Sequence, residues 1–106
     1  MDEQEFTQAA DAMLGRIEAA LEDSGADIDV ELREGGVLEL EFANGSKIIV
    51  NRHGAAREIW VAAKSGGYHY RWVDGNWQDT KGQDEFFATL SRNATLQAGQ
   101  ALRFFA

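Results

Sequence analysis

Carboxylates are the side chains of this protein best suited to chemistry, and they are concentrated near the N-terminus. Thirteen of the 18 Asp and Glu residues fall within the first 41 positions, where Arg16 and Arg33 are the only basic residues. This segment carries a formal charge of −11 and residues 42–106 carry +3, which gives −8 for the whole chain. An acidic surface attracts cations or a basic protein and repels nucleic acid and anionic lipid. We therefore expect neither a nucleic-acid nor a membrane partner.

The types of the other polar residues limit the chemistry of a metal site. The chain has no cysteine, which excludes disulfides, thiolate ligands and thiol catalysis. His53 and His69 lack the spacing of a triad or a zinc site, and neither an EF-hand loop nor a Glu-x-x-His pair is present. Clustered carboxylates alone suit hard cations such as Mg²⁺, Ca²⁺, Mn²⁺ or ferrous iron. We expect weak, exposed binding of cations and no enzyme.

A helix and a strand must position these acids. Helical periodicity from about Glu3 to Asp23 gives one apolar stripe, formed by Phe6, Ala10, Met13, Ile17 and Leu21. Ser24-Gly25 ends this helix, and from Asp27 apolar and acidic residues alternate with a period of two, which indicates a half-buried strand. Because only three residues separate helix and strand, their acids can lie along one edge of the fold.

The remainder of the chain is typical of short antiparallel strands followed by a second helix. Turns are expected at residues 35–36, 44–45, 66–67 and 74–75. The strand that begins at Lys47 is expected to end at Val50, before a loop over residues 51–54, and helical spacing returns from Phe86 to a stop at Gly99. The pattern predicts one α+β domain over residues 1–106, a two-layer sandwich. In it, the N- and C-terminal helices cover one face of a single antiparallel meander of about six strands.

Several of these acids lie where local structural preferences disfavour negative charge. Such departures are expected at functional sites. Glu22 and Asp23 lie in the last turn of the helix, where the helix dipole disfavours negative charge. A hairpin about Gly35-Gly36 also sets like charges opposite each other across the strands, which is destabilising. The two opposed pairs are Glu31 with Glu39 and Asp29 with Glu41. A merely solvated acidic face is therefore the weaker interpretation.

A second candidate surface surrounds Trp60. In residues 58–64 the side chains of Ile59, Val61 and Ala63 share one face, which leaves Trp60 on the other. A two-residue turn at Asn44-Gly45 pairs Leu40 with Ile49 in the core and places Ile48 and Val50 on the outer face. An outward tryptophan rimmed by Arg52, Arg57 and Lys64 is an interaction hot spot. The inverted alternative, with Trp60 in the core, stays open on this pattern.

Two segments closely resemble the bacterial frataxin (CyaY) family: Asn44-Gly45-Ser46-Lys47-Ile48-Ile49-Val50-Asn51 and Glu58-Ile59-Trp60-Val61-Ala62-Ala63-Lys64-Ser65-Gly66-Gly67-Tyr68-His69-Tyr70. The resemblance extends from the acidic first helix to Gly99. It implies a frataxin-like fold and an iron-binding adaptor of iron–sulfur cluster assembly in the bacterial cytoplasm. Members of the family are thought to slow the cysteine desulfurase and the scaffold protein in response to iron, without turning over a substrate.

The resemblance also implies roles for particular residues. An acidic ridge binds Fe²⁺ or Fe³⁺ weakly and docks on a basic surface of the desulfurase; its matching positions here are Glu18, Glu22, Asp23, Asp27, Asp29 and Glu31. Asp2, Glu3 and Asp11 are outlying acids. We expect Glu18, Glu22 and Asp23 to serve the desulfurase as well as iron. The exposed tryptophan of the family matches Trp60, which we expect to meet the scaffold with Asn51, Arg52 and Lys64.

Three departures from the family pattern bear on iron. Thr7 stands where relatives can carry a histidine, Ala19 replaces an acid beside Glu18, and the helix-to-strand loop is two residues shorter. We therefore expect weaker or fewer iron sites, with partner docking affected less. Two other functions stay open: a ferroxidase and iron-storage protein, and an acidic interaction domain without a physiological metal. We expect a monomer, with iron-induced oligomers as an alternative.

Overall fold

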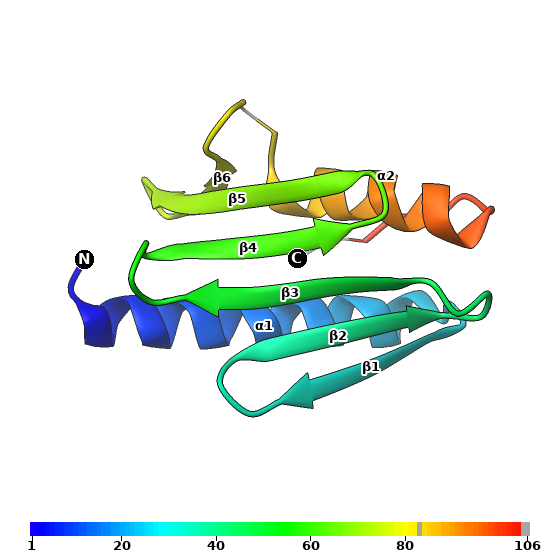
Figure 1. Ribbon diagram of the computed structural model, residues 1–106, viewed down its shortest axis with the longest axis horizontal. Helices are drawn as coiled ribbons and strands as arrows, with labels where there is room; N and C mark the ends of the chain where they lie inside the picture. The colour runs from blue at the N-terminus through cyan, green and yellow to red at the C-terminus, as the bar shows by residue number, and fades with distance from the viewer. Residues whose placement is uncertain (83, 105–106) are drawn as a thin grey trace.

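Two helices and six strands form the part of the chain described by the computed structural model, residues 1–82 and 84–104. Helix α1 (Glu3–Ser24) comes first and helix α2 (Phe86–Ala98) last. Between them lie β1 (Ile28–Arg33), β2 (Val37–Phe42), β3 (Lys47–His53), β4 (Glu58–Ala63), β5 (Gly66–Val73) and β6 (Asn76–Asp79). Each strand pairs antiparallel with the next in chain order, so the sheet is the predicted meander (Figure 1).

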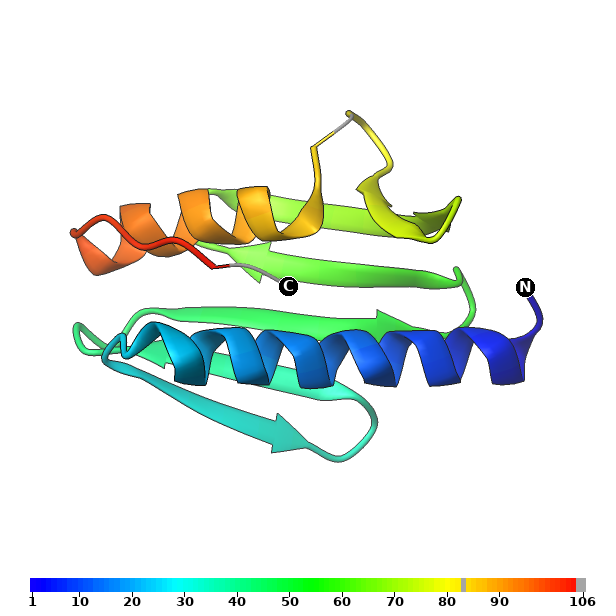
Figure 2. The same cartoon turned by 180° about the vertical axis from the view of Figure 1, so that it is seen from behind.

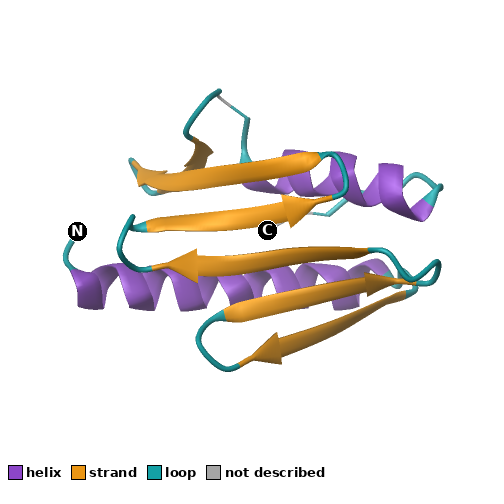
Figure 3. Cartoon of the chain, in the orientation of Figure 1, coloured by secondary structure: helices purple, strands orange, loops and turns teal. Residues whose placement is uncertain are grey.

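Both helices cover the same face of the sheet, which confirms the predicted two-layer α+β sandwich (Figures 2 and 3). α1 contacts β1 and β3, whereas α2 contacts β6. The core between the layers includes Phe6, Ile17, Leu40, Ile59 and Phe86, each 0–1% exposed. Neither helix combines the length and apolarity needed to cross a membrane, within the residues described. The other face of the sheet carries no helix among the residues described (Figure 2).

Both ends of α1 are capped, which fixes where its acids lie. Asp2 forms a capping box with Glu5: the Asp2 carboxylate accepts from the Glu5 N–H at 2.8 Å, and the Glu5 carboxylate accepts from the Asp2 N–H at 3.2 Å. The helix ends at Gly25, whose φ of +68° is left-handed and whose N–H bonds the carbonyl of Glu22. β1 begins only three residues later, so the C-terminal turn of α1 stays beside the start of β1.

The β2–β3 hairpin differs from the prediction. Leu40 pairs with Ile48 rather than Ile49, and Ile48 and Val50 are fully buried. The loop has three residues, because the Phe42 N–H bonds the Ser46 carbonyl and the Gly45 N–H bonds the Phe42 carbonyl, each at 2.9 Å. Gly45, at φ +84°, supplies the left-handed position that such a loop needs. The two-residue turn was therefore wrong by one residue, which exchanges the two faces of β3.

Two strand boundaries also differ from the prediction. β3 continues through residues 51–53, which were predicted as loop, and β5 already begins at Gly66. Ala63 pairs with Gly66, so the turn consists of Lys64 and Ser65 rather than the two glycines. The extension of β3 is the more important difference, since it places His53 on the sheet, diagonally across from Trp60.

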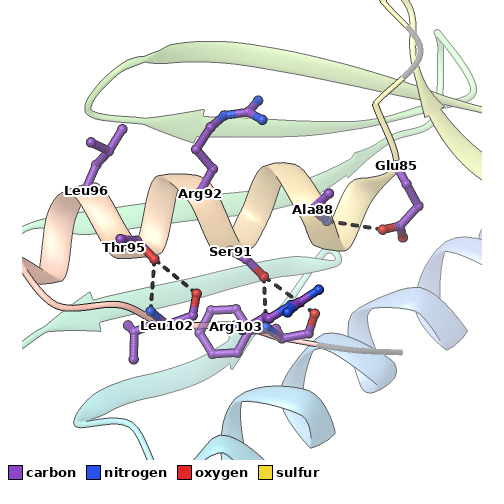
Figure 4. Close-up of a pocket in the computed structure, with 9 residues that line it drawn as sticks. Glu85, Ala88, Ser91, Arg92, Thr95, Leu96, Leu102 and Arg103 are labelled. Atoms are coloured by element: carbon purple, nitrogen blue, oxygen red, sulfur yellow. Dashed lines mark hydrogen bonds between the residues drawn. The ribbon is translucent and has the colours of Figure 1, made fainter.

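The chain after α2 folds back along that helix (Figure 4). The Thr95 hydroxyl accepts from the Leu102 N–H at 2.9 Å and donates to the Leu102 carbonyl at 3.0 Å. The Ser91 hydroxyl likewise accepts from the Phe104 N–H at 2.8 Å. Phe104, 3% exposed, joins the core between the helices. This segment therefore completes the helical layer and leaves the outer face of the sheet untouched.

Candidate functional site

A groove at the edge of the sheet brings part of the acidic ridge together. It lies between the C-terminal half of α1 and β1 and is lined by Glu18, Leu21, Glu22, Ala26, Ile28, Asp29 and Val30. Glu18 and Glu22 are one helical turn apart on α1, and the short connection through Gly25 sets Asp29 against them. Asp23, Asp27 and Glu31 do not line the groove. Three of the six expected ridge acids thus share one hollow.

The groove acids offer hard oxygen ligands, and they have no cationic partner among the residues described. Glu18, Glu22 and Asp29 make no ion pair with any residue that the structure describes, and the last turn of α1 contains no basic residue. Within residues 1–82 and 84–104, no three Asp, Glu or His side chains are already placed to hold one ion. The donor chemistry therefore fits hard cations such as iron, but as loosely held ions rather than ions in a fixed cage.

The predicted opposition of like charges in the first hairpin is present, but one of the two pairs is neutralised. Glu31 lies opposite Glu39, and Asp29 lies opposite Glu41. Arg33 bridges the first pair, with Nη2 3.2 Å from Glu31 and Nε 3.0 Å from Glu39. A hydrogen bond from Lys47, followed by that from Arg33, lowers the pKa of Glu39. Like charges therefore still lie opposite each other at Asp29, whereas Arg33 compensates the charges of Glu31 and Glu39.

The outlying acids do not join the groove. Glu3 is the first residue of α1, at the end of the helix far from Glu22 (Figure 2). Asp11 accepts a hydrogen bond from Nε of Arg52 at 3.0 Å, and Nη1 of Arg52 donates to the carbonyl of Gly35 at 3.2 Å. Arg52 thus ties α1 to the β1–β2 turn on the helical side of the sheet, with the core residue Ile59 opposite it in β4. The structure does not place Arg52 at the rim of Trp60.

Trp60 lies on the outer face, as expected, but it is not a free-standing side chain. Its ring is half-buried between two imidazoles. His53 of β3 stacks on one side at 3.7 Å between ring centroids with 11° between the planes, and His69 of β5 stacks on the other at 4.4 Å and 8°. Asn51 is the cross-strand neighbour of Trp60, whereas Lys64 lies in the β4–β5 turn with its N–H bound to Gln97.

Comparison with known proteins shows the family to which this chain belongs. A model of the frataxin-like domain matches residues 1–100, which is nearly the whole chain. The chain belongs to the bacterial frataxin (CyaY) family. The sequence is 55% identical to the iron–sulfur cluster assembly protein CyaY of Dechloromonas aromatica over 102 residues, which cover 96% of this chain and 97% of that protein.

Further members of the CyaY family support the same assignment. The iron–sulfur cluster assembly protein CyaY of Paraburkholderia phymatum is 55% identical over 100 residues, 94% of each chain. The solved structure of frataxin from Psychromonas ingrahamii superposes with a TM-score of 0.90 at 37% identity, and the match covers 100% of both chains. Both the family and the frataxin-like fold predicted from the sequence are thereby confirmed.

Sequence reasoning missed the environment of one residue on the outer face of the sheet. Glu58 has a side chain only 8% exposed, although it lies on the outer face two residues before Trp60. Burial opposes its ionisation, but hydrogen bonds from Trp60 and Arg71 outweigh burial and lower the pKa of Glu58. The signal in the sequence was weak: with β3 extended to residue 53, His53, Glu58 and Arg71 align across three strands.

Proposed function

We propose that this chain, acting as one domain, is an adaptor of iron–sulfur cluster assembly in the bacterial cytoplasm. It binds iron weakly and regulates the cysteine desulfurase and the scaffold protein without catalysing a reaction of its own. The relatives from Dechloromonas aromatica and Paraburkholderia phymatum, which are named as iron–sulfur cluster assembly proteins, support this role. The observation that carries the proposal is the groove lined by Glu18, Glu22 and Asp29, none of which has an ion-pair partner among the residues described.

The groove suits an ion that must bind and leave again. Its carboxylates offer hard oxygen ligands to ferrous or ferric iron, while the lack of a preformed set of three ligands among the described residues keeps the affinity low. The same negative charges attract a basic surface on the desulfurase. Because both partners use Glu18 and Glu22, with Asp23 beside them, iron and desulfurase compete for this edge of the protein. Competition of this kind makes regulation respond to iron.

The outer face of the sheet serves the second partner. Trp60, with Asn51 beside it in β3, is half-buried and lies on the face that no helix covers. Tryptophan is among the residues that contribute most to protein–protein binding energy. In this proposal the groove faces the desulfurase while the Trp60 face meets the scaffold, so that one small domain contacts both proteins at once.

The desulfurase part of the proposal is tested by reversing charge in the groove and at the neighbouring Asp23. A variant with Glu18, Glu22 and Asp23 changed to Lys is compared with a charge-matched control in which Glu3, Glu34 and Asp84 are changed to Lys. Calorimetry with the desulfurase should show binding weakened by about 100-fold or more in the first variant and much less in the second. Thermal unfolding checks that both variants are folded. Equal affinity in the two variants contradicts the proposal.

The iron part is tested by an anaerobic ferrous titration followed by amide NMR. We expect line broadening confined to residues 18–31, since iron is paramagnetic and only this segment contributes to the groove edge. Glu3 and the amides around Trp60 serve as internal controls. Oxygen uptake after mixing should show no catalytic turnover, whereas sustained turnover favours a ferroxidase. Broadening spread evenly over the acidic surface favours an interaction domain without a physiological metal.

A further inference from the structure

Glu58 is a buried carboxylate in the middle of a face that otherwise serves docking. Carboxylates are rarely buried unless they are paired. The strand register surrounds Glu58 with polar and aromatic neighbours, because it lies opposite His53 of β3 and opposite Arg71 of β5. Trp60 follows two residues later on the same face of β4. The proposed function gives Trp60 a role and leaves the carboxylate beside it without one.

Both oxygens of Glu58 are engaged by the residues of this face. Oε1 accepts the indole N–H of Trp60 at 2.9 Å and lies 3.6 Å from Nδ1 of His69. Oε2 accepts from Nη2 of Arg71 at 2.7 Å. An indole has a single N–H donor, so a bond at that atom fixes how the ring is turned relative to the strand. Arg71 and His69 in turn hold the carboxylate that makes this bond.

The ring held in this way has both of its faces covered. His53 and His69 lie nearly parallel to Trp60 on opposite sides, within 11° and 8° of its plane. The imidazole of His53 is itself fixed, because its Nδ1 accepts the N–H of Ala56 at 3.2 Å. A partner therefore cannot stack on the indole without separating the sandwich. It can meet the exposed edges of the stack and the Arg71 side chain, which is 63% exposed.

We infer that Glu58 is the positioning residue of this docking face: its carboxylate locks the plane of Trp60 between the two histidines. The scaffold protein then meets a rigid platform of ring edges rather than the face of a mobile tryptophan. This inference rests on the proposed contact between the Trp60 face and the scaffold. A side chain that is already fixed loses little conformational entropy on binding, so the locked stack strengthens association.

The locking itself is tested by NMR on the isolated protein. In Glu58→Ala, the ring protons of His53 and His69 should lose most of the upfield shift that stacking on the indole produces, and the Trp60 indole N–H should exchange faster with solvent. Glu58→Gln keeps an acceptor for the indole and should retain most of the stacking shift. Glu41→Gln, on the same face but remote from the stack, is the control. Unchanged histidine shifts in a folded Glu58→Ala protein overturn the inference.

Binding to the scaffold shows whether the locked stack affects docking. We expect Glu58→Ala to bind about tenfold more weakly, the factor that corresponds to one charge-assisted hydrogen bond, and Glu58→Gln to recover most of the affinity. If Glu58→Gln binds as weakly as Glu58→Ala while its stack is intact, Glu58 contacts the partner directly and the positioning role is wrong. Trp60→Ala tests the scaffold contact separately from the locking of the ring. Full affinity in that variant refutes the proposed scaffold contact, while the NMR result still decides what Glu58 does to the ring.

Discussion

The groove beside α1 and the face around Trp60 both contain carboxylates, but the two regions treat them in opposite ways. In the groove, Glu18, Glu22 and Asp29 are open to solvent or partly so and make no ion pair with the described residues. On the Trp60 face, Glu58 is buried and both of its oxygens have partners. Unpartnered charges suit an ion or a protein that comes and goes. A fully bonded carboxylate suits a surface whose shape must already exist before the partner arrives.

Two of the acids expected to bind iron already have arginine partners, as Glu58 has. Glu31 is bound by Arg33, and Asp11 is bound by Arg52, although both were expected among the iron ligands. An arginine already bound to a carboxylate must be displaced before a cation can use that carboxylate. The acidic segment therefore contains acids along the groove without an ion pair to the described residues, and acids bound by arginines: Asp11, which links α1 to the β1–β2 turn through Arg52, and Glu31, which pairs with Arg33 within the hairpin. The following variants test this division.

The largest effect on stability is expected at Glu58. Replacement by Ala removes an acceptor from Trp60 and Arg71, and hydrogen bonds to charged groups are worth about 1.5–3 kcal/mol each, so we expect the free energy of unfolding to fall by about 2 kcal/mol. Glu22→Ala, the matched truncation in the groove, should leave stability unchanged or raise it slightly, because no contact is lost. Urea unfolding of both variants measures the difference. Equal destabilisation removes the distinction between the two regions.

A second, smaller effect is expected in the pH dependence of stability. The pKa of Glu58 in the folded protein lies below its ordinary value of 4.5, because the hydrogen bonds from Trp60 and Arg71 outweigh burial. Its ionised form therefore contributes stability that is fully present above pH 4.5 and is lost as the pH falls through the folded pKa. The native chain should exceed Glu58→Gln in unfolding free energy at neutral pH, and the gap should close in acid.

Much of the fold could be predicted from periodicity and turn residues, while the faces of β3 could not. The first hairpin has the predicted register, since acidic and apolar residues alternate clearly through β1 and β2. In β3, Ile48, Ile49 and Val50 are all apolar, so a period of two does not select a face. Asn44-Gly45 is compatible with both a two-residue and a three-residue loop, and packing against α1 decides between them.

The site was predictable to the extent that it depends on local sequence. Glu18, Glu22 and Asp29 are brought together by a short connection, which the sequence shows directly. The pairing of Asp11 with Arg52 joins residues 41 positions apart, and no local pattern indicates it. The stack around Trp60 likewise requires the register of three strands, which depends on where β3 ends. Contacts between distant segments, rather than residue types, decide which acids remain available.

A moderate effect is expected at Asp11. Asp11→Asn weakens the ion pair with Arg52, and because the Asp11 side chain is 52% exposed, solvent screening limits the loss of stability to about 0.5–1 kcal/mol. Iron should still broaden the amides of the groove to the same extent in the ferrous titration. Glu18→Gln is the complementary variant, with unchanged stability and reduced broadening. If Asp11→Asn abolishes the broadening, Asp11 is an iron ligand after all and the division of the acids is wrong.

The smallest effect, and the one of opposite sign, is expected at the end of α1. Asp23 lies in the last turn, which contains no basic residue, so its charge opposes the helix dipole. Asp23→Lys should raise the free energy of unfolding by about 0.5 kcal/mol at low ionic strength, and the gain should shrink as salt screens the interaction. Asp23→Asn, which removes the charge without reversing it, should give about half the gain. If stability rises while desulfurase binding weakens, the acids of this edge serve binding and lower the stability of the fold. A loss of stability in both variants shows instead that Asp23 has a structural partner, and it then belongs with Asp11 and Glu31.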